Sequence, residues 1–219
     1  MTYDKHQFRQ MGFIKPEMIE GKSVYMIGAG GVGSPTALIL SKMGFEDIHV
    51  FDHDIVEDQN VGSQLYWTTQ DQQKKVEALK SFVETFTAYP EKFPKEGLKL
   101  NPLSIVISAV DSMEMRKQIW DYLKEQPMIS LYIDARMGLE SIRIYGIDMN
   151  NDKEIDLYEQ NLYPDSEADI TPCSARAVAY NGFFAASVIG GIVSAYLRGV
   201  EKPVEVIGDM EKFGLAITL

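Results

Sequence analysis

The chain has 219 residues, of which 45% are hydrophobic and 24% are charged, and its formal net charge is −11. This profile fits a globular protein with one filled core, and the acidic surface disfavours nucleic acid and anionic membranes as general partners. A single cysteine excludes a disulfide framework and a four-cysteine zinc site within one chain. The first residues lack the apolar core of a signal peptide, so we expect a cytoplasmic location.

Strands and helices are predicted to alternate through roughly the first 135 residues. Short apolar runs predict strands at 23–27, 47–51, 103–110 and 128–133. Helical periodicity or composition predicts helices at 35–43, 69–86 and 112–125, after a helical lead-in over 1–22. This alternation favours the α/β class, with a doubly wound, Rossmann-like, mainly parallel sheet and helices on both faces.

The last third of the chain has a different pattern. Residues 139–149 alternate in a way that predicts an antiparallel strand, and 150–171 are acidic and lack periodicity, which predicts a long surface loop. Residues 177–197 carry no charge and could span a bilayer by length. Because the segment is only weakly hydrophobic and has small residues four apart, we expect a buried core helix. A hairpin at 204–207 and 215–218 completes one domain over residues 1–219.

The strongest local motif is the glycine-rich loop that follows the first strand. Gly28, Gly30, Gly31 and Gly33 stand at a strand-to-helix junction, where free N–H groups and the helix dipole favour a phosphate. Asp52 ends the next strand and can accept hydrogen bonds from ribose hydroxyls. These residues predict a bound nucleotide, although a tight packing turn would use the same glycines. An NAD-dependent oxidoreductase would also need an acid or base for hydride transfer, and no His–Asp or Tyr–Lys arrangement stands out.

Other segments accompany the glycine loop in a specific order: Phe8-Arg9-Gln10, the stretch from Phe51 to Gln64, Lys75-Val76-Glu77-Ala78, and Ala109-Val110-Asp111-Ser112 with Arg116 behind it. In this combination the chain resembles the ThiF/MoeB/HesA superfamily, whose members are related to ubiquitin-activating enzymes. The resemblance runs from about Gln7 to Arg198. It is far more specific than any one of its parts.

The resemblance implies an ATP- and Mg²⁺-dependent adenylyltransferase. In such an enzyme a carboxylate attacks the α-phosphate of ATP, which yields an acyl-adenylate and pyrophosphate. The expected carboxylate is the C-terminus of a small ubiquitin-like or sulfur-carrier-like protein. Other members use the adenylate to make peptide antibiotics or to dehydrate a modified tRNA base, so the acceptor stays open. We expect no room for a separate cysteine domain or ubiquitin-fold domain.

The same resemblance assigns roles to individual residues. Asp52 would hold the ribose, Lys75 would neutralise the phosphates, and Asp111 would bind Mg²⁺. Arg9 would reach into the partner subunit's site, which implies a homodimer. The nucleotide-binding set would comprise Gly28, Gly30, Gly31, Gly33, Asp52, Asp54, Asn60, Gln64 and Lys75. Each role has a simpler alternative: Lys75 as a solvated neighbour of Lys74, Asp111 as a helix N-cap, and Arg9 as a surface arginine.

Two features depart from the family pattern. The family has an arginine where this chain has Ser63, so one phosphate contact is missing unless Arg136 or Arg176 replaces it. A nucleotide-binding but non-catalytic partner subunit is therefore an alternative to the enzyme. The paired zinc-binding Cys-x-x-Cys motifs of the family are absent, and we expect no zinc.

Cys173 is the only cysteine and stands where some members carry a reactive one. It precedes the small-residue helix, and Arg176 is close in sequence. Both features can lower the pKa of a thiol and allow it to attack an adenylate as a thiolate. A buried, unreactive cysteine is the alternative.

Overall fold

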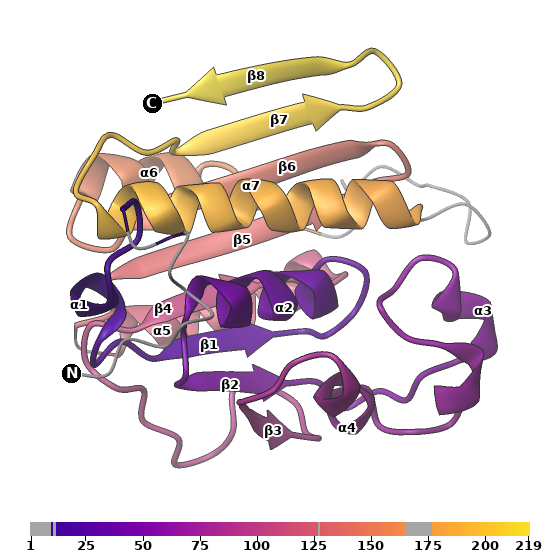
Figure 1. The fold of residues 1–219 in the computed structure, drawn as a ribbon. Helices are drawn as coiled ribbons and strands as arrows, with labels where there is room; N and C mark the ends of the chain where they lie inside the picture. Colours follow the sequence, from indigo (N-terminus) through magenta and orange to yellow (C-terminus); the bar gives the residue numbers. More distant parts are fainter. Residues whose placement is uncertain (1–9, 11, 127, 165–176) are drawn as a thin grey trace.

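A computed structural model describes residues 10, 12–126, 128–164 and 177–219 of the chain. These residues form an eight-stranded sheet in the order β3-β2-β1-β4-β5-β6-β7-β8. The strands are β1 (Val24–Ile27), β2 (Ile48–Phe51), β3 (Thr87–Tyr89), β4 (Ile105–Ser108), β5 (Leu131–Met137), β6 (Ser141–Asp148), β7 (Glu205–Asp209) and β8 (Gly214–Thr218). The strands from β3 to β5 are parallel and the remaining pairs are antiparallel, which confirms the predicted fold class (Figure 1).

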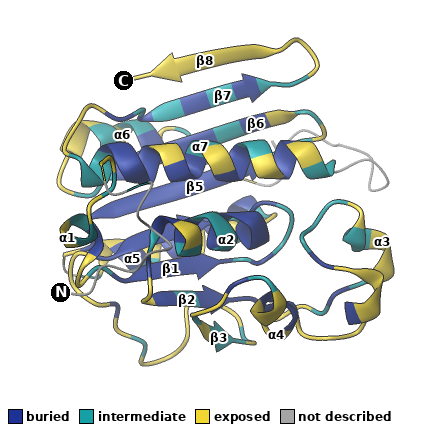
Figure 2. Ribbon diagram, viewed as in Figure 1, coloured by how far each residue is buried: buried dark blue, intermediate teal, exposed yellow. Residues whose placement is uncertain are grey.

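Helices cover both faces of the sheet. The α-helices are α1 (Pro16–Ile19), α2 (Gly33–Met43), α3 (Asp58–Val61), α4 (Lys75–Ala78), α5 (Met113–Lys124), α6 (Asp152–Glu159) and α7 (Ala179–Leu197). Two short 3₁₀ turns, η2 (Thr68–Gln70) and η3 (Leu79–Ser81), flank α4. Helices α2 and α7 lie together on one face, and α5 and α6 pack on the other (Figure 1). The burial colours of Figure 2 show the central strands enclosed between these layers and β8 exposed.

The predicted helix at 69–86 is wrong as one continuous element. Val76, Leu79 and Val83 are fully buried, as the predicted apolar stripe requires. The backbone, however, forms η2, α4 and η3 in succession, and Gln72 has a φ of 67°. A left-handed residue cannot continue a right-handed helix, so the chain bends there. β3 follows this segment and was not predicted.

The predicted loop at 150–171 is also partly wrong, because α6 begins within it. The Asn151 side chain caps the helix by accepting a hydrogen bond from the Lys153 N–H at 3.2 Å. Asp152 and Glu154 lie in the first turn, where their charges favour the helix dipole. Tyr158 is the only residue of α6 that is fully buried, which explains the weak apolar signal.

Helix α7 is, within the described residues, the one helix long and apolar enough to cross a membrane. It packs on α2, β5 and β6, and 56% of the apolar window is buried. A Cβ at Gly190 would lie 2.9 Å from Ile39 of α2, so the small residue allows the two helices to approach closely. This packing supports the expected core helix.

Candidate functional site

The glycine loop connects the carboxyl end of β1 to α2, and its shape depends on the glycines. Gly28 has a φ of 94°, and a Cβ there would lie 2.5 Å from the Ala109 carbonyl at the end of β4. A Cβ at Gly33 would lie only 1.9 Å from the Gly28 carbonyl. Gly30, in contrast, has open space where a side chain would project. The loop is therefore packed tightly below and open at Gly30, as a phosphate-binding turn requires.

Two contacts from distant segments hold this loop in place. The Tyr66 hydroxyl donates to the Ala29 carbonyl at 2.7 Å. On α7, Gly182 comes so close that a Cβ would lie 2.3 Å from the Gly31 carbonyl. Burial, with a smaller contribution from Asp52, raises the pKa of Tyr66, so this phenol stays a neutral donor. The sequence patterns did not predict Tyr66, whereas the small-residue spacing of α7 indicated a close approach without identifying the loop as its partner.

Asp52 lies at the end of β2 and already makes two hydrogen bonds. Its Oδ2 accepts the Ala29 N–H at 2.7 Å and its Oδ1 accepts the Asp54 N–H at 2.8 Å. The residue is only 8% exposed. Because each carboxylate oxygen has two lone pairs, both can accept a further hydrogen bond. Asp52 therefore ties the glycine loop to the β2 end and keeps acceptor capacity for a ribose.

Lys75 and Asp54 form an ion pair in the lining of a small cavity. The cavity has a volume of about 150 Å³ and is lined by Asp54, Ile55, Glu57, Asn60 and Lys75. The Lys75 Nζ lies 2.9 Å from the Asp54 Oδ2, and Lys75 is 6% exposed. Partial burial acts to raise the pKa of Asp54, but the hydrogen bond and charge of Lys75 outweigh it and lower that pKa.

The neighbouring lysine has a different environment. Lys74 is exposed, and its Nζ donates to the His53 carbonyl at 2.6 Å. The structure thus brings Lys75, Asp54 and Asn60 together and leaves Lys74 outside the cavity. This geometry agrees with the choice of Lys75 over Lys74.

Gln64 and Ser63 lie on the segment that follows α3. The Gln64 Oε1 is buried and has no hydrogen-bond partner within the described part of the chain, so it is free to accept from a ligand. The Ser63 Oγ donates to the Asn60 carbonyl at 3.2 Å. The Ser63 carbonyl would lie 3.0 Å from a Cβ at Gly31. Ser63 therefore lies directly against the glycine loop.

Asp111 is exposed and follows the carboxyl end of β4. It is not the N-cap of α5, because Ser112 has that position and its Oγ accepts the Met115 N–H at 3.1 Å. Since Ala109 contacts Gly28, the Asp111 turn begins beside the glycine loop. An exposed carboxylate at this place is compatible with the predicted Mg²⁺ ligand, and this role of Asp111 stays a prediction.

Asp52, His53 and Asp54 are a second group that could hold a cation, since each offers a ligand atom within 4.8 Å of the others. Asp52 and Asp54 are already bonded to Ala29 and Lys75, respectively. His53 lies 3.3 Å from the Asp54 carboxylate and is half-exposed. These existing partners make Asp111 the better candidate for the metal.

Behind the Asp111 turn lies a buried ionic cluster that we define as Arg116, Asp134 and Arg136. Arg116 donates to the Val110 carbonyl and to the Asp134 carboxylate. The Arg136 Nε donates to the other Asp134 oxygen at 2.8 Å. Both arginines were identified from the sequence, whereas Asp134 was not predicted; its signal was an acid within the apolar strand β5. The Arg136 Nε is bonded to Asp134, and the role of Arg136 as a replacement for the family arginine stays a prediction.

Arg9, Cys173 and Arg176 lie outside the described residues. The predicted trans role of Arg9, the covalent role of Cys173 and the compensating role of Arg176 therefore stay predictions.

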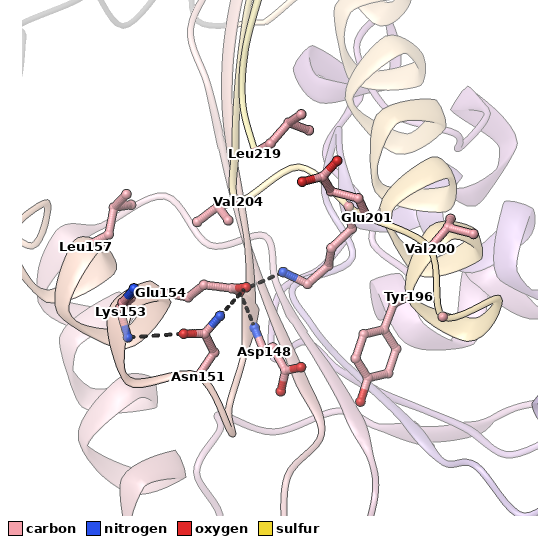
Figure 3. A pocket seen from close by; sticks show the side chains of 12 residues that line it. Asp148, Asn151, Lys153, Glu154, Leu157, Tyr196, Val200, Glu201, Val204 and Leu219 are labelled. Carbon is pink, nitrogen blue, oxygen red and sulfur yellow. Dashed lines mark hydrogen bonds and ion pairs between the residues drawn. The ribbon is translucent and has the colours of Figure 1, made fainter.

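A larger cavity, of about 540 Å³, lies at the other edge of the sheet, near the end of β6, the end of α7 and the C-terminus (Figure 3). Two of its charged side chains, Lys202 and Glu154, form an ion pair with each other. The Lys202 Nζ donates to the Glu154 carboxylate at 2.6 Å and to the Gly146 carbonyl at 2.7 Å, and Asn151 donates to the other Glu154 oxygen at 2.9 Å. This cavity contains none of the predicted site residues.

Comparison with known proteins agrees with the geometry. A family model described as "ThiF family" matches residues 5–130. Ubiquitin-like modifier-activating enzyme 5 of Caenorhabditis briggsae is 28% identical over 131 residues, which cover 51% of this chain and 30% of that protein. The chain thus spans about a third of the length of such relatives. The sulfur carrier protein adenylyltransferase of Thermus thermophilus is 26% identical over 222 residues, covering 89% of this chain and 76% of the relative.

Solved structures share the fold at low sequence identity. Escherichia coli MccB, solved with AMPCPP and MccA, matches with a TM-score of 0.71 and 13% identity, covering 99% of this chain and 72% of that chain. PaaA matches with a TM-score of 0.68 and 16% identity, covering 97% of this chain and 68% of that chain. At these identities the similarity concerns the fold alone.

Proposed function

The chain belongs to the ThiF family, and from this membership we propose that it is an adenylyltransferase that activates a carboxylate with ATP and Mg²⁺. The proposed products are an acyl-adenylate and pyrophosphate. The observation that carries the proposal is the convergence of the open glycine loop, the buried Lys75 and the exposed Asp111 at the carboxyl edge of one parallel sheet. Ligands of open α/β sheets bind at this edge.

The residues at this edge fit a nucleoside triphosphate. The glycine loop presents N–H groups at a helix N-terminus, and Lys75 adds a buried positive charge. The buried Gln64 Oε1 has no partner within the described residues and can accept a hydrogen bond from the nucleotide. Asp52 has lone pairs left for ribose hydroxyls.

The barrier to the proposed reaction is the approach of one anion to another. A carboxylate must come close to the triphosphate, so the site has to neutralise charge and hold the two groups in line. In the proposed mechanism Lys75 supplies this charge, and Asp54 holds its ammonium group in position at 2.9 Å. Mg²⁺ at Asp111 would screen the phosphate oxygens further. The carboxylate oxygen then bonds to the α-phosphorus while pyrophosphate leaves.

The proposed substrate is the C-terminus of a small ubiquitin-like or sulfur-carrier-like protein. The names of the relatives support this class, since they include ubiquitin-like modifier-activating enzymes and a sulfur carrier protein adenylyltransferase. We further propose a cytoplasmic homodimer without structural zinc, in which Arg9 completes the site of the other subunit. A covalent role of Cys173 in transferring the acyl group is part of the same proposal.

ATP–pyrophosphate exchange tests the proposal. The purified protein would be incubated with ATP, Mg²⁺, labelled pyrophosphate and a panel of glycine-terminated carrier proteins and short peptides. We expect exchange with at least one member of the panel, and loss of exchange on removal of Mg²⁺ or in Asp111→Asn. Clean ATP binding without exchange on any carboxylate would contradict the enzyme.

One observation favours the alternative, a nucleotide-binding subunit without catalytic activity. Ser63 lies against the glycine loop at the position where the family has an arginine. If this absence disables the chain, Ser63→Arg should create exchange activity that the native protein lacks. If the native protein is an active enzyme, exchange should be measurable both in the native protein and in Ser63→Arg.

A further inference from the structure

The buried cluster of Arg116, Asp134 and Arg136 contains more positive than negative charge. Asp134 is fully buried, Arg116 is 4% exposed and Arg136 is 9% exposed. Both guanidinium groups pair with the single Asp134 carboxylate, which is the only acid that the ion pairs of the described residues give them. Tyr158 also donates to Asp134, at 3.1 Å, and adds no charge. Among the described residues, the cluster thus has one positive charge without a counterion.

The unbalanced charge is centred on Arg136. Its Nε donates to Asp134 and its Nη1 to the Asn161 carbonyl at 3.1 Å, whereas its Nη2 is buried and has no hydrogen-bond partner in the part of the chain that the structure describes. The Arg116 guanidinium donates hydrogen bonds to the Asp134 carboxylate, the Ala135 carbonyl and the Val110 carbonyl. An unpaired buried donor on a charged group costs free energy unless a ligand completes it. Arg136 therefore has the capacity to bind one more oxyanion.

The other described neighbours of Arg136 supply no second counterion. Its cross-strand neighbour is Arg143 on β6, a like charge that Glu205 neutralises at 3.3 Å. The Arg136 guanidinium lies over the rings of Tyr145 and Tyr163, with centroids at 4.8 and 5.6 Å. These rings shield the group from water and orient its plane, but they do not balance its charge.

The strand register places Arg136 next to the candidate site. Ser108 on β4 pairs with Asp134 on β5. Arg136 lies two residues beyond Asp134 and Val110 lies two residues beyond Ser108, so both are at the same level, at the carboxyl edge of the sheet. Asp111 follows Val110 directly, and Arg116 bonds to the Val110 carbonyl. On the other face of β5, Met137 would lie 3.3 Å from a Cβ at Gly31. Arg136 and the glycine loop therefore meet the same edge from opposite faces of the sheet.

We propose that Arg136 binds the carboxylate of the acyl substrate and holds it beside the Asp111 turn. This inference rests on the proposed adenylation. A carboxylate is favoured over a nucleotide phosphate because the glycine loop and Lys75 serve the phosphates from the other face. The planar guanidinium fork matches a carboxylate, and Asp134 and Arg116 fix its orientation. Asp134 and Arg116 are positioning residues, and Arg136 is the residue that touches the substrate.

Binding of a small probe tests the proposal without knowledge of the natural substrate. The probe is N-acetylglycylglycine, and its C-terminal amide is the control for the carboxylate. The full-length protein, with ATP and Mg²⁺ present or absent, would be titrated with each probe while its melting temperature is recorded. Arg136→Gln is the test variant, Arg136→Lys keeps the charge without the fork, and Arg143→Gln is the matched control on the facing strand.

We expect the acid, and not the amide, to stabilise the native protein and Arg143→Gln. For Arg136→Gln the apparent affinity for the acid should fall about tenfold or more, which is what losing a charge-assisted hydrogen bond produces. Arg136→Lys should fall between the two. The affinity for ATP should change less than that for the acid in every variant, which separates the carboxylate from the nucleotide.

Other outcomes overturn the proposal. Equal response of Arg136→Gln and the native protein to the acid would remove Arg136 from the binding site. A selective loss of ATP affinity would assign Arg136 to the nucleotide instead. The chain also has three acids at 165–169, outside the described residues. If the acid stabilises only a variant in which Asp165, Glu167 and Asp169 are neutral, the partner of Arg136 belongs to the chain itself.

The same titration separates this inference from the proposed function. Arg136-dependent binding of the acid in a protein that shows no ATP–pyrophosphate exchange would contradict adenylation and leave the carboxylate site intact. ATP–pyrophosphate exchange in Arg136→Gln together with an unchanged affinity for the acid would support adenylation and contradict the carboxylate site at Arg136.

Discussion

At the scale of single residues, adjacent lysines differ in burial and in partner. Lys75 is 6% exposed and paired with Asp54 in the small cavity, whereas Lys74 is exposed and bound to a backbone carbonyl. A buried charge near the glycine loop acts in a medium of lower dielectric than water, so its effect on an anionic ligand is larger than that of an exposed charge. Only Lys75 is therefore expected to matter for the reaction.

This difference gives the first prediction. Lys75→Ala should lower the exchange rate by about 100-fold or more, because it removes a preorganised cation from the reacting phosphates. Lys74→Ala should change it by no more than about twofold, as surface charges usually do. Steady-state exchange assays on both variants, with the melting temperature as a folding control, decide the point. Equal losses in the two variants would contradict the assignment of Lys75.

The second prediction concerns the pH dependence of the Asp54–Lys75 pair. The pKa of Asp54 is lower in the native state than its ordinary value of 3.8, so its charge stabilises the folded protein above that pH. Asp54→Asn should therefore destabilise the protein by a constant amount between about pH 5 and 7. As the pH falls below 3.8, the difference should shrink, because the carboxyl takes up a proton in the unfolded state before it does so in the native state. Urea unfolding of both proteins across this range measures it, and a difference that grows on acidification would contradict the pair.

Residue types at strand ends predicted much of the candidate site. Asp52, Lys75 and the glycines lie where the motifs indicated, because the carboxyl ends of parallel strands meet at one edge. Tyr66 and Asp134 were not predicted. Tyr66 bonds to the Ala29 carbonyl, 37 residues away, and Asp134 bonds to Arg116, 18 residues away, and no local pattern encodes such contacts.

At the scale of elements, α7 supports the glycine loop through a single close contact. Gly182 touches the Gly31 carbonyl, and Asn181 beside it donates to the carbonyls of Gly138 and Ser141 in the β5–β6 turn, at 3.1 Å each. The N-terminal part of α7 therefore connects the glycine loop to the β5–β6 turn at the edge of the sheet. A change in this contact should affect ATP binding without touching any ligand.

The third prediction uses two glycines of the same helix. Gly182→Ala would bring a methyl group to 2.3 Å from a backbone oxygen, so α7 or the loop must shift. We expect a destabilisation of about 1–3 kcal/mol together with weaker ATP binding. Gly191→Ala meets open space and should stabilise the protein by up to about 1 kcal/mol, since alanine is the better helix former.

Denaturant unfolding and ATP titration of both variants test this contact. Similar stability and ATP affinity for Gly182→Ala and Gly191→Ala would show that the helix does not support the loop.

The elements that the sequence failed to predict share one property: their conformation depends on contacts elsewhere. β3 pairs only with β2 and lies at the sheet edge, so its three residues have a weak burial pattern. α6 has one buried residue and an otherwise acidic surface. The break at Gln72 is a backbone feature that the periodicity of Val76, Leu79 and Val83 does not contain. The longer helices α2, α5 and α7 were predicted within a few residues.

At the scale of the whole molecule, the alternation of strands and helices predicted the doubly wound parallel sheet. The antiparallel strand β6 was also predicted, from the alternation over residues 139–149, and in the structure it pairs with β5. The strand order was not predictable in the same way. It places β1 between β2 and β4, and this crossover brings the glycine loop beside the segment that leads to Asp111.

The whole molecule is expected to join the carboxylate oxygen directly to the α-phosphorus of ATP. An isotope experiment measures this bond. The carboxylate that supports exchange would be labelled with ¹⁸O and incubated with the protein, ATP and Mg²⁺, and hydroxylamine would then attack the carbonyl carbon of the product. We predict that the released AMP carries one ¹⁸O atom from the carboxylate. Unlabelled AMP, or release of ADP and phosphate in place of AMP and pyrophosphate, would contradict adenylation.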